Sequence, residues 1–301
     1  MGVPHYIDGY SFTNKTFLLS PEASILRSLA ESLYPAYLSR KLQENQPIHP
    51  HPIPALDEQF VASREALWFR VLAETIYAEI ILQREEVKHT VLCFGSARIG
   101  SKKFKGTPEM AVYYKYAEEL SEKLTRWSMS LVEPGSPPPF MICSGGGPGI
   151  MEAGNRGAMN AGGRSIGLNI HLPTEQQPNP YISKEFVFNF QYFFTRKFHF
   201  LKRAKAIVVF PGGYGSLDEL FETLTLIQTG KIDPVKVILF GTAFWKDILN
   251  LPRMVDHGVI APSDLELFEY HDSVETAVQA IQQELLTILN HEKLHSLPTV
   301  L

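Results

Sequence analysis

The alternation of hydrophobic and polar residues changes near residue 88 of this 301-residue chain. Beyond that point, short and mostly apolar segments predict six β-strands: TVLCF (90–94), FMIC (140–143), SIGLNI (165–170), FVFNF (186–190), AIVVF (206–210) and VKVILF (235–240). Between them, apolar residues recur every three or four positions and predict helices over 108–127, 148–161, 192–204 and 216–228, with another from about residue 243. Apolar strands that alternate with helices are typical of a parallel sheet covered on both faces. The pattern predicts a doubly wound, Rossmann-like α/β domain over residues 88–260.

The segments on either side of this domain have other patterns. Residues 57–87 predict one long amphipathic helix, which either covers the main domain or forms a subunit contact. PIHPHPIP (47–54) predicts an extended connector, because alternating prolines cannot form a helix. Residues 273–293 predict a further amphipathic helix that packs on the sheet or on a partner. The chain is thus expected to consist of an N-terminal extension (1–87), the α/β domain (88–260) and a C-terminal helical tail (261–301).

Composition adds few further constraints. Hydrophobic residues make up 45% of the chain and charged residues 20%, which is typical of a globular protein. The formal net charge of -4 gives no overall attraction for nucleic acid or an anionic membrane, so neither is expected as a partner. Cys93 and Cys143 lie in apolar segments and are expected to be small buried residues and not a disulfide or a metal site. The start of the chain lacks the pattern of a signal peptide and no segment has about twenty consecutive apolar residues, which predicts a cytoplasmic location.

Glycine is concentrated directly after three of the predicted strands, in GSARIGSKKFKG (95–106), SGGGPGIMEA (144–153) and PGGYGSLDE (211–219). In doubly wound folds, ligands bind beyond the carboxyl ends of the strands, where these clusters fall. A glycine after a strand also simply permits a tight turn, so each cluster alone has two interpretations. Three clusters at one edge of one sheet favour a composite site for phosphate and sugar.

The third cluster has the features of a phosphate site. Gly212, Gly213 and Gly215 let the backbone approach an anion closely. A helix that begins near Ser216 would offer free N–H groups and the positive end of its dipole. In the first cluster, Arg98 would add a fixed positive charge.

Two common nucleotide motifs are absent. The dinucleotide fingerprint G-x-G-x-x-G fails because its last position is Ile150 in the second cluster and Asp218 in the third. The phosphate-binding pattern G-x-x-x-x-G-K-[ST] fails because Ser101 precedes Lys102. NAD binding and ATP hydrolysis are therefore not indicated, and no cofactor or metal is expected.

Several of these segments resemble one known family. PGGYGSLDE resembles the PGGxGTxxE signature of the Lonely Guy (LOG) family, whose members are often described as lysine decarboxylases, and FFTRK (193–197) resembles its MHxRK element. SGGGPGIMEA and GSAR are also similar to the family's, so the resemblance covers residues 90–255. It departs from the family at Phe193 and Phe194, which replace Met-His, and at Ser216, which replaces threonine.

The resemblance implies an activity and a set of residues. LOG members are phosphoribohydrolases that cleave nucleoside 5'-monophosphates, including cytokinin ribotides, to the free base and ribose 5-phosphate, and related nucleosidases act on AMP. The family's catalytic pair falls on Arg196 and Glu219. Its phosphate-binding residues fall on Gly212, Gly213, Gly215 and Ser216, and further candidates for substrate binding are Gly146, Gly147, Ser96, Arg98, Lys197 and Glu222. The expected assembly is a homodimer or a larger homo-oligomer.

The chemistry agrees with this assignment, although each residue has a plainer role open to it. Cleavage of an N-glycosidic bond develops positive charge on the ribose, which a carboxylate such as Glu219 stabilises, with Arg196 holding that carboxylate ionised. Alternatively, Ser216 and Glu219 form an S-x-x-E capping box, Arg196 is one of several surface bases, and Glu222 is simply solvated.

Two other functions stay open or are disfavoured. A protein of this fold class without turnover would resemble the molybdenum-cofactor carrier proteins, which hold a phosphorylated pterin; this is the alternative to an enzyme. A pyridoxal-phosphate-dependent decarboxylase is disfavoured because no lysine stands in an S-x-H-K pattern.

Overall fold

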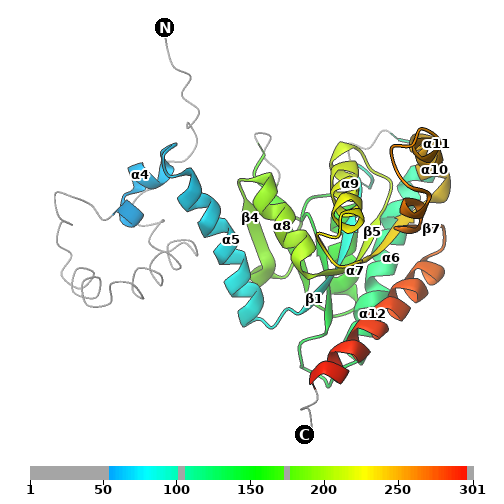
Figure 1. Ribbon diagram of the computed structural model, residues 1–301. Coiled ribbons are helices and arrows are strands. Elements are labelled where there is room, and N and C mark those ends of the chain that lie inside the picture. Colours follow the sequence, from blue (N-terminus) through cyan, green and yellow to red (C-terminus); the bar gives the residue numbers. More distant parts are fainter. Residues whose placement is uncertain (1–53, 101–105, 173–176, 297–301) are drawn as a thin grey trace, which may run out of the picture. The chain divides into compact units, whose positions relative to one another are not determined.

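The computed structural model describes residues 54–100, 106–172 and 177–296 (Figure 1). The chain divides into two units, Met1–Tyr77 and Ala78–Leu301. The predicted Pro-His connector over 47–54 lies outside the described residues except for Pro54, which begins a short 3-10 helix.

The first unit contains a short helix that the sequence pattern did not separate from the next one. A 3-10 turn, η1 (Pro54–Leu56), leads into α4 (Glu58–Ala62), whose first N–H groups are capped by the Asp57 carboxylate at 3.0 and 3.1 Å. The chain then turns at Ser63, in extended conformation, and continues as α5 (Leu67–Arg84), which runs on into the second unit. The prediction of one helix over 57–87 is therefore wrong, because Ser63 ends the first helix and its hydroxyl bonds to the Phe60 carbonyl at 2.6 Å.

The second unit is built on a parallel sheet of seven strands in the order β4-β3-β2-β1-β5-β6-β7. The strands are β1 (His89–Phe94), β2 (Phe140–Ser144), β3 (Ser165–Ile170), β4 (Val187–Phe190), β5 (Ala204–Val209), β6 (Lys236–Phe240) and β7 (Glu269–His271). Every neighbouring pair is parallel, which confirms the predicted doubly wound α/β fold. The sequence analysis missed β7, because its three residues lie at the sheet edge, are not buried and carry no apolar pattern.

Helices connect the strands close to the predicted positions. They are α6 (Pro108–Ser130), α7 (Ile150–Asn160), α8 (Phe193–Arg203), α9 (Tyr214–Gln228), α10 (Thr242–Ile248), α11 (Leu251–Asp256) and α12 (Val274–Ser296), with short 3-10 turns η2 (Lys184–Phe186) and η3 (Pro262–Glu266). The helix predicted from residue 243 is in fact two helices, α10 and α11, since Leu249 adopts an extended conformation between them. The predicted start of α9 at Ser216 is two residues too late.

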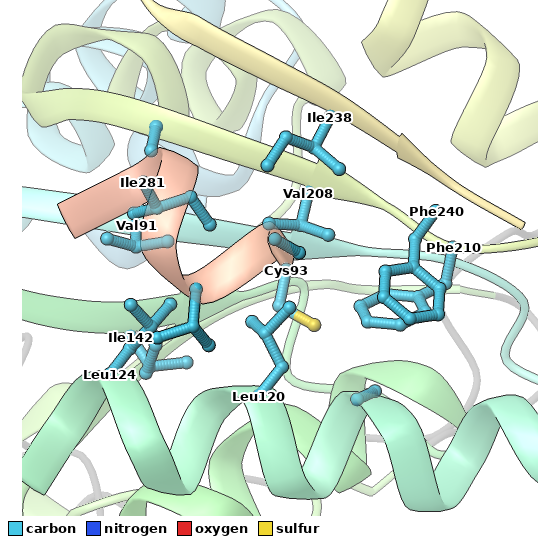
Figure 2. Packing of buried hydrophobic residues seen from close by; sticks show 14 of the residues in the cluster. Val91, Cys93, Leu120, Leu124, Ile142, Val208, Phe210, Ile238, Phe240 and Ile281 are labelled. Carbon is cyan, nitrogen blue, oxygen red and sulfur yellow. The ribbon is translucent and has the colours of Figure 1, made fainter. Parts of the chain in front are cut away.

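One face of the sheet packs against α6, α7 and α12, and this contact forms the main core (Figure 2). Val91 and Cys93 of β1 lie there beside Leu120 of α6 and Ile281 of α12, all at most 2% exposed. The tail helix α12 thus packs on the sheet, one of the two outcomes expected for it. Cys93 and Cys143 are buried and free, as predicted.

The opposite face of the sheet contacts α8. Because neighbouring strand residues point to opposite faces, Phe94 lies on the other side from Cys93, and its ring meets the Phe200 ring edge to face at 5.0 Å. The chain turns from β1 to β2 on one side, while β5 lies on the other side of β1. This reversal of strand order is the switch point at which α/β sheets bind their ligands, and the loops after β1 and β5 flank it.

Candidate active site

A cavity of about 630 Å³ lies at the carboxyl ends of the strands, beside this switch point. All three glycine clusters contribute to its wall, through residues 94–99, Gly145 and Met151, and residues 211–217. The remaining lining side chains come from helices: Met110, Arg196, Phe200, Glu219 and Phe244. The sequence prediction that the clusters meet at one edge is therefore confirmed by their shared cavity.

Backbone hydrogen bonds at Ser96 join the three loops. The Ser96 N–H donates to the carbonyl of Pro211 at 3.0 Å, and the Ser96 carbonyl accepts from the N–H of Ile150 at 3.0 Å. Gly149, with φ of 73°, passes so close to this carbonyl that a Cβ there would collide with it. Gly149 is thus a position where glycine is required to bring the loops together.

The loop after β5 leads directly into α9 and forms the polar side of the cavity. Gly213 is the N-cap residue, and within the described part of the chain no side chain caps this helix, so its first N–H groups have no capping acceptor there. Ser216 lies inside the first turn, 7% exposed, with its hydroxyl against Gly212. These N–H groups and the hydroxyl form an anion-binding arrangement at the positive end of the helix dipole.

The early start of α9 decides between two interpretations of Ser216. A capping box requires the serine at the N-cap and the glutamate three residues later. Here the N-cap is Gly213, so Ser216 is the third helical residue and Glu219 the sixth. The capping-box alternative is therefore wrong, and Glu219 is left for another role.

Arg196 and Glu219 face each other across the cavity wall, from α8 and α9. Arg196 Nη2 lies 3.4 Å from Glu219 Oε1, and the two side chains are 12% and 7% exposed. Arg196 is therefore not one of several surface bases, the plainer role open to it. Among the residues that the structure describes, no other arginine or lysine side chain lies within salt-bridge distance of Glu219.

The electrostatics of this pair differ from the expectation that Arg196 holds the carboxylate ionised. Burial raises the pKa of Glu219 from its usual 4.5 to about 7, and Arg196 and Lys197 offset only part of that rise. Burial likewise lowers the pKa of Arg196, while the charge of Glu219 raises it. Near neutral pH Glu219 is thus present in both its protonated and its ionised form, which suits a group that exchanges protons.

The other predicted residues divide into two groups. Ser96 and Arg98 line the cavity, as do Gly212, Gly213, Gly215 and Ser216. Lys197 and Glu222 do not line it: the Lys197 Nζ lies 2.9 Å from a carboxylate oxygen of Glu222 and 2.9 Å from one of Asp218, beside the cavity.

Gly146 and Gly147 are also outside the cavity wall, where Gly145 takes their place. Both are buried, and their carbonyls accept hydrogen bonds from Asn179 Nδ2 at 3.1 Å. Asn179 also donates to Asn155 at 2.9 Å, so it fixes the shape of this loop. Sequence reasoning missed Asn179, since no motif or spacing links it to the glycine cluster.

The apolar wall of the cavity was missed as well. Met110 of α6, Met151 of α7 and Phe244 of α10 line the cavity, and these three residues belong to no common sequence motif. They come from three helices far apart in sequence, and each fits an amphipathic pattern whose apolar residues are expected in the core. Only the fold brings them to one place, where they suit the face of a planar ring.

No three His, Cys, Asp or Glu side chains in the described ranges are grouped in a way that would hold a metal ion. No helix in the described part of the chain has the length and apolar character needed to cross a membrane.

Comparison with known proteins gives the same answer as the motifs. Residues 151–281 match a family model described as "Possible lysine decarboxylase". The cytokinin riboside 5'-monophosphate phosphoribohydrolase LOG1 of Arabidopsis thaliana is 26% identical over 160 residues, which is 52% of this chain and 72% of that protein. The resemblance to the LOG family is confirmed. A second LOG relative, the probable cytokinin riboside 5'-monophosphate phosphoribohydrolase LOGL2 of Oryza sativa subsp. japonica, is 26% identical over 63% of this chain and 70% of its own.

These LOG relatives are by name phosphoribohydrolases, which are enzymes of the N-glycosidase type. Among solved structures, the molybdenum cofactor carrier protein from Chlamydomonas reinhardtii is 19% identical over 66% of this chain and 99% of that one, with a TM-score of 0.43.

Proposed function

We propose that the protein hydrolyses the N-glycosidic bond of nucleoside 5'-monophosphates, releasing the free base and ribose 5-phosphate. The observation that carries the proposal is the buried Arg196–Glu219 pair, which lines the same cavity as the uncapped N-terminus of α9. The Arg196–Glu219 pair can supply a carboxyl that exchanges protons, and the N-terminus of α9 can hold a phosphate.

The spacing along α9 suits this substrate. Glu219 is the sixth residue of the helix, so it lies about 7.5 Å along the axis from the first helical residue, at 1.5 Å per residue. With the 5'-phosphate at Gly212, Gly213 and Gly215, that distance is the span of one ribose, and the anomeric carbon lies near the carboxyl. The base then extends toward the apolar wall that includes Met110 and Phe244.

The reaction needs charge stabilisation and proton movement. As the bond from the anomeric carbon to the base nitrogen breaks, positive charge develops on the ribose, and the ionised carboxylate of Glu219 stabilises it. Water adds its hydroxyl to the anomeric carbon as the bond to the base breaks, Glu219 accepts the proton of that water, and Glu219 then passes this proton to the base nitrogen and is ionised again. Arg196 stays positively charged and donates hydrogen bonds to the phosphate or the ribose hydroxyls.

The substrate within this class is proposed to be AMP or a cytokinin ribotide. The test is to incubate the protein with a panel of nucleoside 5'-monophosphates, the matching nucleosides and cytokinin ribotides, and to measure free base and ribose 5-phosphate. Release from the monophosphates and not from the nucleosides is expected, because the N-terminus of α9 would contribute only when a phosphate is present.

A matched pair of variants tests the role of Glu219. Glu219→Gln should abolish release while AMP still binds, whereas Asp218→Asn, which removes an exposed carboxylate from the same helix, should leave release within about twofold. If wild type and Glu219→Gln bind AMP equally and neither releases base, the protein is a carrier of a phosphorylated ligand, and co-purified pterin fluorescence would identify the molybdenum-cofactor type.

The remaining proposals concern assembly and location. We infer a homodimer or larger homo-oligomer in the cytoplasm, with nucleoside monophosphate as the small-molecule partner. Large exposed rings support a subunit contact: Phe198 is 50% exposed, Tyr214 93% and Phe221 36%, on α8 and α9. Sedimentation equilibrium should give a mass of at least twice 33.9 kDa, and a monomer at all concentrations would contradict it.

A further inference from the structure

We propose that Phe193 is a positioning residue that holds the Arg196 guanidinium in the orientation used by the cavity, and this inference rests on the proposed function of that site. Phe193 is one of the two residues that replace Met-His in the motif. The helix geometry, the sparse hydrogen bonding of Arg196 and the place of the Phe193 ring outside the cavity each support it.

The guanidinium lies close to two aromatic rings of its own helix. Positions 193, 196 and 200 are three and four residues apart, so their side chains share one face of α8. The central carbon of the Arg196 guanidinium lies 5.1 Å from the centroid of the Phe193 ring and 5.3 Å from that of Phe200. Both distances are within the range of cation–π attraction.

Hydrogen bonds do little to orient Arg196. Its Nη2 lies 3.4 Å from Glu219, which is long for a charge-assisted hydrogen bond. Its Nε is buried and has no hydrogen-bond partner among the residues that the structure describes. An aromatic ring can fix a guanidinium without occupying any of its N–H groups, so the two rings leave those donors available to an anionic ligand.

Phe193 acts through Arg196 because its own ring does not line the cavity. Arg196 and Phe200 line the cavity, and Phe193 does not. Phe193 is 50% exposed, whereas Phe200 is 1% exposed and forms part of the core. A change at position 193 therefore alters the cation–π contact without opening a cavity in the core.

The orientation of Arg196 also bears on Glu219. The charged groups that act on Glu219 are Arg196 and Lys197 from α8 and Glu222 and Asp218 from α9. Arg196 is the strongest of those that favour the ionised carboxylate. If Arg196 loses its fixed position, the carboxyl of Glu219 becomes harder to ionise, and its pKa moves upward.

The experiment compares Phe193→Leu with Phe194→Leu. Phe194 is the adjacent residue and is 55% exposed, and in the part of the chain that the structure describes its ring contacts Tyr192 and not Arg196, so it is a matched control. Phe193→Leu should lower kcat/KM for AMP by about three- to thirtyfold, which corresponds to the range of cation–π contacts between exposed and desolvated sites. It should weaken binding of ribose 5-phosphate similarly and raise the pKa of Glu219, followed by NMR of labelled glutamate. Phe193→Tyr should restore all three values, and Phe194→Leu should leave them unchanged.

Two outcomes overturn the proposal. One is an equal effect of Phe193→Leu and Phe194→Leu on these three values, and the other is failure of Phe193→Tyr to restore them. If the wild-type protein releases no base at all, the proposed function fails, but the Glu219 titration still decides the role of Phe193. In that case an unchanged pKa in Phe193→Leu rejects the positioning role.

Discussion

Replacing Glu219 by glutamine should make the folded protein more stable at pH 8. The carboxyl is buried, so its ionised form is disfavoured in the folded state and its pKa rises from 4.5 to about 7. A glutamine has the shape of the neutral carboxyl and does not ionise, so its burial carries no free-energy penalty for ionisation. The Glu219 carboxyl binds its proton more tightly in the folded state than in the unfolded state. The parent protein therefore loses stability as pH rises from 4.5 through 7, whereas the Glu219→Gln variant lacks this pH-dependent loss.

The size of the effect follows from the difference between the two pKa values. A shift of one unit corresponds to about 1.4 kcal/mol, so the full difference amounts to about 3 kcal/mol at pH 8 and above. At pH 5.5 the carboxyl is largely protonated in the folded state but mostly ionised in the unfolded state. The difference in unfolding free energy between Glu219→Gln and the parent from this group is then about 1.4 kcal/mol. The stability gap between Glu219→Gln and the parent should therefore widen by about 2 kcal/mol between these two pH values.

Urea denaturation of both proteins at half-unit steps from pH 5.5 to 8.5 measures this gap, and titrating groups that do not interact with Glu219 cancel in the difference. Asp218→Asn is the control, since that side chain is 55% exposed and its removal should change stability by less than about 0.5 kcal/mol at every pH. A gap that stays constant with pH, or one in which the parent is the more stable at pH 8, would show that burial does not dominate the ionisation of Glu219.

Three further predictions test other parts of the structure. Gly212→Ala should weaken binding of ribose 5-phosphate by about tenfold or more in calorimetry, because the new Cβ collides with the Ser216 hydroxyl. Arg203→Met should destabilise the fold by about 3 kcal/mol in urea denaturation, because it removes the bidentate partner of Glu79 at 2.8 and 2.9 Å; an unchanged midpoint would contradict this. If the ionised form of Glu219 is the active one, kcat/KM for AMP should rise with pH up to about 7 and then level off.

The sequence predicted the sheet well because its strands are buried on both faces. The strand Ser165–Ile170, for example, is buried over its first five residues, and the structure places it at the predicted bounds. The errors fall where burial is partial. β7 has no fully buried residue, and the break at Ser63 lies in a segment whose apolar spacing continues across it. Periodicity records which side of an element is buried, and it contains no signal for a hydrogen bond such as that from Ser63 to Phe60.

The candidate site was predictable as far as it depends on glycines that follow strands. Topology alone brings those loops together, since the carboxyl ends of parallel strands share one edge. Which glycine of a cluster faces the cavity was not predictable: Gly145 does, and Gly146 and Gly147 do not, because Asn179 binds their carbonyls from a distant loop. The prediction for Lys197 and Glu222 has the same weakness, since their mutual contact outside the cavity depends on how two helices face each other.

The protonation state of Glu219 shows why residue types alone do not define the chemistry of a site. From the sequence, an arginine beside a glutamate predicts an ionised pair, because opposite charges favour the charged forms. In the structure both partners are nearly buried, and the loss of water outweighs their attraction, so the carboxyl has a pKa of about 7. The same pair on the surface would be fully ionised at neutral pH and unable to hold a proton. Burial by α8 and α9 therefore converts an ordinary ion pair into a group that can gain and lose a proton near neutral pH, as the proposed function requires.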